Sequence, residues 1–142
     1  MKLSCIYIET DKFNEVVDFY EKVFQIKGHV YTKNRWVEFD FGNKLSIYNC
    51  QYDIETIKEN TNNYSQSFIE NFKQSKEKAV NNIITLNFYS NNLKSDYERI
   101  KTLKISEVSD IMYVNITEPY YYFNIYDPEG NEIEICGNKL DE

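Results

Sequence analysis

Histidine, glycine and proline are all scarce in this sequence. Its 142 residues include one histidine, four glycines and two prolines. With a single histidine there is no second imidazole to activate a thiol, and no Gly-x-Ser-x-Gly turn is present to expose a serine. The chain therefore lacks a nucleophile–base pair of either common kind.

Cysteine pairs and long apolar runs are missing as well. Cys5, Cys50 and Cys136 are an odd number without Cys-x-x-Cys spacing, which predicts free, buried thiols in a reducing compartment. The N-terminal residues lack the apolar core of a signal peptide, and no run approaches the length of a membrane-spanning helix. We expect a cytoplasmic protein with no membrane partner.

Positive charge is in deficit, because the formal net charge is −7. Phosphate binding needs clustered lysine and arginine, so nucleic acid is not expected as a partner. A small cationic ligand would be attracted, although an acidic surface commonly serves solubility alone.

Aromatic side chains are abundant, at 16% of the residues, and 13 of them are tyrosines. Together with 42% hydrophobic residues, they are sufficient for the core of one compact domain or of two half-domains. Tyrosine has an apolar ring and a polar tip, which suits a cavity that is wet at one end.

The first half of the chain predicts the order strand, helix and three strands. Alternation over residues 3–9 places Ile6 and Ile8 on one face, and Cys5 and Tyr7 on the other. Apolar residues recur at helical spacing from Phe13 to Phe24. We expect Asp11 to cap that helix and Gly28 to end it. The three strands are predicted at 29–32, 36–41 and 44–49, with a Gly42-Asn43 turn between the last two.

The second half repeats this order. A strand at 83–89 precedes a helix that Asn92 caps and whose apolar stripe is Leu93, Tyr97, Ile100 and Leu103. Strands follow at 112–116, 121–126 and 132–136. "GNKLSIYN" at 42–49 aligns with "GNEIEICG" at 130–137, and "CIYIETDKF" at 5–13 aligns with "TLNFYSNNL" at 85–93. We therefore predict one domain, 1–142, built from two repeat units, 1–50 and 82–138.

The connection at 51–81 contains a polar sequence, "NTNNYSQS" at 60–67, which predicts a loop. A short amphipathic helix is predicted after it, with Phe68, Ile69, Phe72 and Ala79 on its apolar side. Such a connection is either a lid or partner-contact element, or a tolerated insertion.

Two motifs carry a resemblance to a known family. With "FYEKVF" in its first helix and "DPEGNEIEI" in its last hairpin, the chain resembles the glyoxalase/bleomycin-resistance/dioxygenase family, also called the vicinal oxygen chelate superfamily. The resemblance implies an α+β fold in which tandem βαβββ units form two facing half-barrel sheets around a cavity. It also implies a homodimer.

In metal-using members of the family, a divalent ion is held by side chains from the first and last strand of each unit. Glu134 matches the last-strand ligand of the second unit, while Glu132 shares its face but lies nearer the turn. The other three positions fall at Ser46, at Leu3 or Cys5, and at Ile83 or Thr85, and His29 lies in a different strand. We expect no metal or other cofactor. A metal bound through unusual ligands, such as a thiol site of Cys5, Cys136 and Glu134, is the alternative.

Three hypotheses remain for Glu134 without a metal. It accepts hydrogen bonds from Thr85 and a tyrosine as a satisfied polar group, it pairs with a cationic or amide-bearing guest, or it is a general base whose pKa burial raises. If Glu134 recognises a guest, the candidate ligand-binding residues are Cys5, Tyr7, Trp36, Ser46, Thr85, Asn87, Tyr122 and Glu134.

Two function classes follow from the resemblance. One is a non-catalytic small-molecule binder of the antibiotic-sequestering type. The other is a divergent metal-dependent lyase, isomerase or dioxygenase. The aromatic residues favour binding, although strand aromatics commonly just pack a sheet against its helices.

Overall fold

A computed structural model describes residues 4–73, 84–115 and 119–137 of the chain. The chain divides into two compact units, Met1–Ala79 and Val80–Glu142, and each contains one four-stranded sheet. None of the helices within these described ranges is long and apolar enough to cross a membrane.

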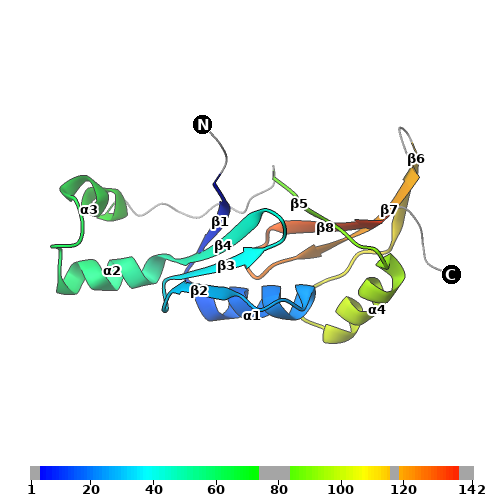
Figure 1. The fold of residues 1–142 in the computed structure, drawn as a ribbon, viewed down its shortest axis with the longest axis horizontal. Coiled ribbons are helices and arrows are strands. Elements are labelled where there is room, and N and C mark those ends of the chain that lie inside the picture. Colours follow the sequence, from blue (N-terminus) through cyan, green and yellow to red (C-terminus); the bar gives the residue numbers. More distant parts are fainter. Residues whose placement is uncertain (1–3, 74–83, 116–118, 138–142) are drawn as a thin grey trace. The chain divides into compact units, whose positions relative to one another are not determined.

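The first unit follows the predicted element order (Figure 1). Its elements are β1 (Ile6–Thr10), α1 (Phe13–Phe24), β2 (His29–Thr32), β3 (Trp36–Asp40), β4 (Lys44–Asn49), α2 (Cys50–Glu59) and α3 (Gln66–Lys73). The sheet order is β1-β4-β3-β2. β1 runs parallel to β4, whereas the other pairs are antiparallel.

One face of this sheet is covered by α1, which packs on β4. The alternation in β3 and β4 buries Val37, Phe39, Leu45 and Ile47. The helical spacing of α1 buries Val16, Phe19, Tyr20 and Val23, and the rings of Tyr20 and Phe39 lie 5.8 Å apart. Apolar residues that recur every two positions in the strands and every 3.6 positions in the helix thus pack together into one core.

The ends of α1 differ from the prediction. Asp11 does not cap the helix: Lys12 is the N-cap residue, without a side-chain cap, and the Thr10 hydroxyl accepts from the Lys12 backbone N–H at 2.8 Å. The helix ends at Gln25, which takes the left-handed conformation at φ 53°, so Gly28 is not its end. A Cβ at Gly28 would lie 2.4 Å from Val37 Cγ1, so this glycine allows a close approach of the chain to β3.

The second unit repeats the architecture of the first. Its elements are β5 (Leu86–Tyr89), α4 (Leu93–Leu103), β6 (Met112–Asn115), β7 (Pro119–Tyr126) and β8 (Glu132–Gly137), with sheet order β5-β8-β7-β6. β5 runs parallel to β8, as β1 does to β4. The predicted tandem of βαβββ units and the α+β class are confirmed, whereas a shared cavity between the sheets stays a prediction.

Local chemistry explains the boundaries of the second unit. The Asn92 side chain caps α4 as predicted, accepting from the Ser95 N–H at 2.9 Å. In the hairpin between β7 and β8, Asp127 Oδ1 accepts from the backbone N–H groups of Glu129 and Asn131, both at 2.9 Å. Gly130 supplies a φ of 83°, so the "DPEGN" motif forms a tight turn by itself.

The connection contains one helix that was not predicted, whereas the predicted polar loop is present at 60–65. α2 was missed, and it begins directly after β4 because Asn49 caps it, accepting from the Gln51 N–H at 3.2 Å. α3 begins at Gln66, two residues before the predicted start at Phe68, and buries Ile69. The predicted Ala79 lies outside the described residues, as does the side chain of Phe72.

Candidate functional site

The sheet of the first unit has a second face that α1 does not cover, here called free face 1. Across its middle row, Tyr7, Ser46, Glu38 and His29 are neighbours on β1, β4, β3 and β2. Ser46 is fully buried, and its Oγ has no hydrogen-bond partner among the described residues. Glu38 binds Lys44 at 3.1 Å. The predicted residue Cys5 precedes β1 as a half-buried free thiol.

Three aromatic rings meet on free face 1, and we call them the ring cluster: Tyr7, Trp36 and Tyr48. The ring of Tyr7 lies 5.3 Å from Trp36 and 6.2 Å from Tyr48, and Trp36 lies 5.8 Å from Tyr48. Tyr7 is 54% exposed, whereas Tyr48 is buried. The cluster therefore presents an accessible ring on a packed base.

The sheet of the second unit has a corresponding surface on the side away from α4, here called free face 2. Asn87, Glu134 and Asn124 are adjacent across β5, β8 and β7. Asn87 Nδ2 donates to Glu134 Oε1 at 2.5 Å. Asn124 Oδ1 is buried and has no hydrogen-bond partner in the described part of the chain. A carboxylate and an unpaired acceptor thus lie on neighbouring strands.

The hydrogen bonds of Thr85 and Asn87 differ from the hypothesis in which Thr85 donates to Glu134. Thr85 donates to Glu132 at 3.4 Å rather than to Glu134. The parallel register of β5 and β8 sets Asn87 beside Glu134, so Asn87 takes the position that the hypothesis assigned to Thr85. The interpretation that Glu132 and Glu134 share a face is confirmed, because Ile133 and Ile135 between and after them are buried.

Tyr122 also belongs to free face 2, where it is the neighbour of Cys136. Its ring lies 5.5 Å from Tyr120, two residues away along the strand. Tyr121 points to the opposite side, where its ring lies 4.7 Å from Tyr113 of β6. Tyr121 and Tyr122 therefore lie on opposite faces of the sheet, as neighbours on a strand do.

The Cys136 thiol is half-buried beside Asn87, and its Sγ lies 3.6 Å from Asn87 Oδ1. Burial raises the pKa of Cys136 and outweighs the lowering by the hydrogen bond to Asn87, while the negative charge of Glu134 adds a smaller increase. A thiol with a raised pKa is a poor nucleophile and a poor metal ligand at neutral pH.

The donor atoms do not fit the divalent centre that the resemblance implies. Nowhere in the described ranges do three or more His, Cys, Asp or Glu side chains converge to hold an ion. In the second unit Glu134 is flanked by the amides of Asn87 and Asn124, and in the first unit the matching position is the Ser46 hydroxyl. Leu3 and Ile83, two of the alternatives for the remaining positions, lie outside the described residues.

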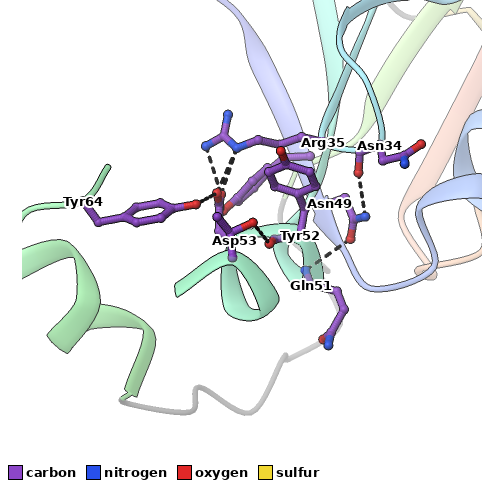
Figure 2. A network of polar contacts seen from close by, with 9 residues as sticks. Asn34, Arg35, Asn49, Gln51, Tyr52, Asp53 and Tyr64 are labelled. Carbon is purple, nitrogen blue, oxygen red and sulfur yellow. Dashed lines mark hydrogen bonds and ion pairs between the residues drawn. The ribbon is translucent and has the colours of Figure 1, made fainter. Parts of the chain in front are cut away.

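A buried carboxylate lies behind the ring cluster, and sequence reasoning missed it. Asp53 of α2 is 1% exposed. Arg35 Nε donates to both of its oxygens at 3.0 Å, and the hydroxyls of Tyr48 and Tyr64 donate at 2.5 and 2.7 Å. Figure 2 shows Arg35 and Tyr64 converging on Asp53. We call these four residues the Asp53 network.

The Asp53 network shifts the pKa values of its members. Burial alone would raise the pKa of Asp53, but the hydrogen bonds from Arg35, Tyr48 and Tyr64 outweigh burial and hold it below its ordinary value. Burial raises the pKa of the Tyr48 hydroxyl, and the neighbouring Asp53 carboxylate adds to that increase. The carboxylate is therefore charged and the phenol neutral at neutral pH.

Two other residues of this region were missed, and strand parity could have found them. Tyr48 lies two residues after Ser46 and Glu38 two residues after Trp36, so each shares a face with a residue that the sequence placed in the site. No comparable signal marked Asp53, because its helix α2 was not predicted.

The two sheets can be compared with known structures. No family profile matches the sequence, and no curated protein matches it. Solved structures do match over nearly the whole chain. A lactoylglutathione lyase from Agrobacterium tumefaciens is 20% identical with a TM-score of 0.62, over 98% of this chain and 95% of that one. The chain has the glyoxalase fold.

Two further structures support this assignment. A glyoxalase/bleomycin resistance protein/dioxygenase family enzyme from Burkholderia phytofirmans PsJN has a TM-score of 0.64 at 15% identity, over 98% of this chain and all of that one. A glyoxalase-related enzyme from Fulvimarina pelagi has a TM-score of 0.65 at 12% identity, over 96% and 88%. The structural similarity establishes the glyoxalase fold. At identities this low the activity has to be argued from the residues.

Proposed function

We propose that this glyoxalase-fold protein binds a small molecule that presents an N–H donor or a cationic group, and that it sequesters this molecule without transforming it. The observation that carries the proposal is the acceptor pair on free face 2. Glu134 is a carboxylate with one donor, Asn87, and Asn124 Oδ1 beside it is buried without a partner among the described residues. Both atoms accept hydrogen bonds, so the matching guest group is a donor.

The energetics favour a guest at this position. A buried acceptor without a partner costs about 1–3 kcal/mol, and a ligand donor placed against Asn124 Oδ1 would recover that cost. A donor shared with the Glu134 carboxylate would form a charge-assisted bond, which is roughly twice as strong as a neutral one. A cationic donor is further favoured by the net charge of −7.

The ring cluster of the first unit is a second surface that suits an aromatic or cationic guest. Tyr7 is more than half exposed and has Trp36 5.3 Å away, so a flat group can stack on it. Aromatic faces also attract cations. On free face 2 the proposed binding residues are Glu134, Asn124, Asn87 and Tyr122. The first unit offers a separate proposed binding surface, with Tyr7, Trp36 and Ser46 on free face 1 and Cys5 just before β1.

The test is a calorimetric titration of cationic aromatic compounds, each compared with a neutral compound of the same shape. Glu134→Gln keeps the shape of the side chain and removes its charge. It should weaken binding of the cation by about 1–3 kcal/mol, or roughly 5- to 150-fold.

Glu132→Gln is the matched control, because Glu132 lies on the same strand and face but two residues nearer the turn. It should change affinity by less than about twofold, the effect of a screened surface charge. Equal losses in the two variants, or an unchanged affinity in E134Q, would remove Glu134 from the site.

A further inference from the structure

Tyr48 belongs both to the ring cluster and to the Asp53 network. Its ring lies 5.8 Å from Trp36 and 6.2 Å from Tyr7 on free face 1. Its hydroxyl donates to Asp53 Oδ2 at 2.5 Å. One side chain therefore joins the proposed ligand surface to helix α2.

Asp53 is held on all sides by donors. Arg35 contacts both carboxylate oxygens, and its guanidinium carbon lies 5.2 Å from the centre of the Tyr48 ring. The guanidinium thus contacts the ring as well as the carboxylate, which leaves the Tyr48 ring little freedom to rotate away from Trp36.

Stability alone does not account for this arrangement. Moving a carboxylate from water to a site that is 1% exposed has a large desolvation cost, and well-packed apolar residues usually stabilise such a position as well or better. Buried ionic groups do specify one geometry among several, because each hydrogen bond has a required direction. The geometry specified here is that of Tyr48.

The Asp53 carboxylate also binds a residue of the segment that follows α2. Tyr64 donates to Asp53 Oδ1 at 2.7 Å, and its ring stacks on Phe68 of α3 at 5.2 Å. The position of the segment from Tyr64 to α3 and the position of Tyr48 therefore depend on one side chain.

We propose that Asp53 is a positioning residue for the ring cluster: α2, through Asp53, holds Tyr48 in the orientation in which Tyr7 and Trp36 accept an aromatic cation. This inference rests on the proposed function. It assigns a role to the connection between the repeat units, which is to complete free face 1 rather than merely to link the units.

The first measurement needs no ligand. Trp36 is the only tryptophan, so its emission maximum and its quenching by acrylamide report on the ring cluster alone. Asp53→Asn and Tyr48→Phe should each shift the emission and increase quenching. Glu55→Gln, which removes an exposed carboxylate from the same helix, should leave both unchanged.

The second measurement uses benzyltrimethylammonium and tetramethylammonium as probes. D53N and Y48F should each weaken binding of the aromatic probe by about 2- to 10-fold, the range for one aromatic contact. Binding of the smaller probe should change less. The two effects should not add in the double variant, because both substitutions break the same contact.

The outcomes separate the inference from the function on which it rests. If wild-type protein binds neither probe, the proposed function fails, and Trp36 emission still decides whether Asp53 positions the ring cluster. If D53N does not fold, Y48F takes its place, because it keeps the ring and removes only the hydroxyl contact. A folded D53N or Y48F protein with unchanged emission, quenching and probe affinity would overturn the inference.

Discussion

Asn87 and Glu134 face each other across β5 and β8, joined by a 2.5 Å hydrogen bond from Nδ2 to Oε1. This pair gives the Glu134 carboxylate a charge-assisted hydrogen bond on free face 2. Asn124 on the other side of Glu134 contributes an acceptor that is buried and unpaired within the described ranges. Glu134 therefore has a hydrogen-bond donor beside it on β5, and on β7 an acceptor that a ligand donor could bind.

Replacing Asn124 with leucine separates a ligand site from a structural residue. We expect N124L to be as stable as wild type or more stable without ligand, because an unpaired buried acceptor is replaced by an apolar group of similar size. The stabilisation of the protein by ligand should be reduced. Thermal melts with and without the cationic probe measure both effects.

Asn87→Leu is the matched comparison for N124L. It removes the donor to Glu134 and, because Asn87 is exposed, should destabilise the unliganded protein by about 0.5–1.5 kcal/mol. Equal destabilisation by N124L and N87L would indicate that Asn124 has only a structural role.

Tyr122→Leu and Tyr121→Leu test which side of the second sheet binds the ligand. Tyr122 lies on free face 2, whereas Tyr121 contacts Tyr113 on the opposite face. Y122L should weaken ligand binding by about 2- to 10-fold through lost stacking, and Y121L should leave affinity unchanged while affecting stability. Calorimetry and thermal melts distinguish these effects, and indistinguishable variants would count against the assignment.

The Asp53 network makes the free energy of unfolding depend on pH in the acidic range. Because the folded-state pKa of Asp53 is lowered, its contribution is fully present above the unfolded-state value of about 3.9 and is lost as pH falls through the folded-state pKa. Wild type should exceed D53N in free energy of unfolding by about 1–3 kcal/mol at pH 7, the range for hydrogen bonds to a charged group. The difference should shrink below pH 4. Urea titrations across this range measure it, and a difference independent of pH would contradict the prediction.

Protein purified without chelator should contain far less than one equivalent of transition metal. The donor atoms beside Glu134 are amides, and Ser46 occupies the corresponding position in the first unit. Elemental analysis by mass spectrometry provides the measurement. Near-stoichiometric nickel, zinc, manganese or iron that is lost in E134Q would instead support a divergent metal-dependent lyase, isomerase or dioxygenase.

We also predict a homodimer. The edge strand β2 exposes Val30 at 57% and Tyr31 at 71%, and the edge strand β6 exposes Tyr113 at 52%. Exposed strand edges with apolar side chains need covering. Light scattering at tens of micromolar should give twice the mass of the chain, and a monomer there would oppose the prediction.

Local and periodic features could be predicted from the sequence alone. The strand alternation assigned Tyr7 and Ile8 to opposite faces, and the Asn92 cap and the Asp127 turn marked their boundaries correctly. The repeat predicted two units of the same βαβββ order, and the resemblance carried by "FYEKVF" and "DPEGNEIEI" implied the fold. Apart from the repeat, these signals depend on neighbours within a few residues.

Tertiary structure decided what depends on register and burial. The pairing of β5 with β8 set Asn87, rather than Thr85, beside Glu134. α2 has few apolar residues, and it is held in place through the buried Asp53 by Arg35, which lies 18 residues away in sequence. A charged residue in a polar stretch carries no local sign of burial, since its partners come together only when the sheet has formed.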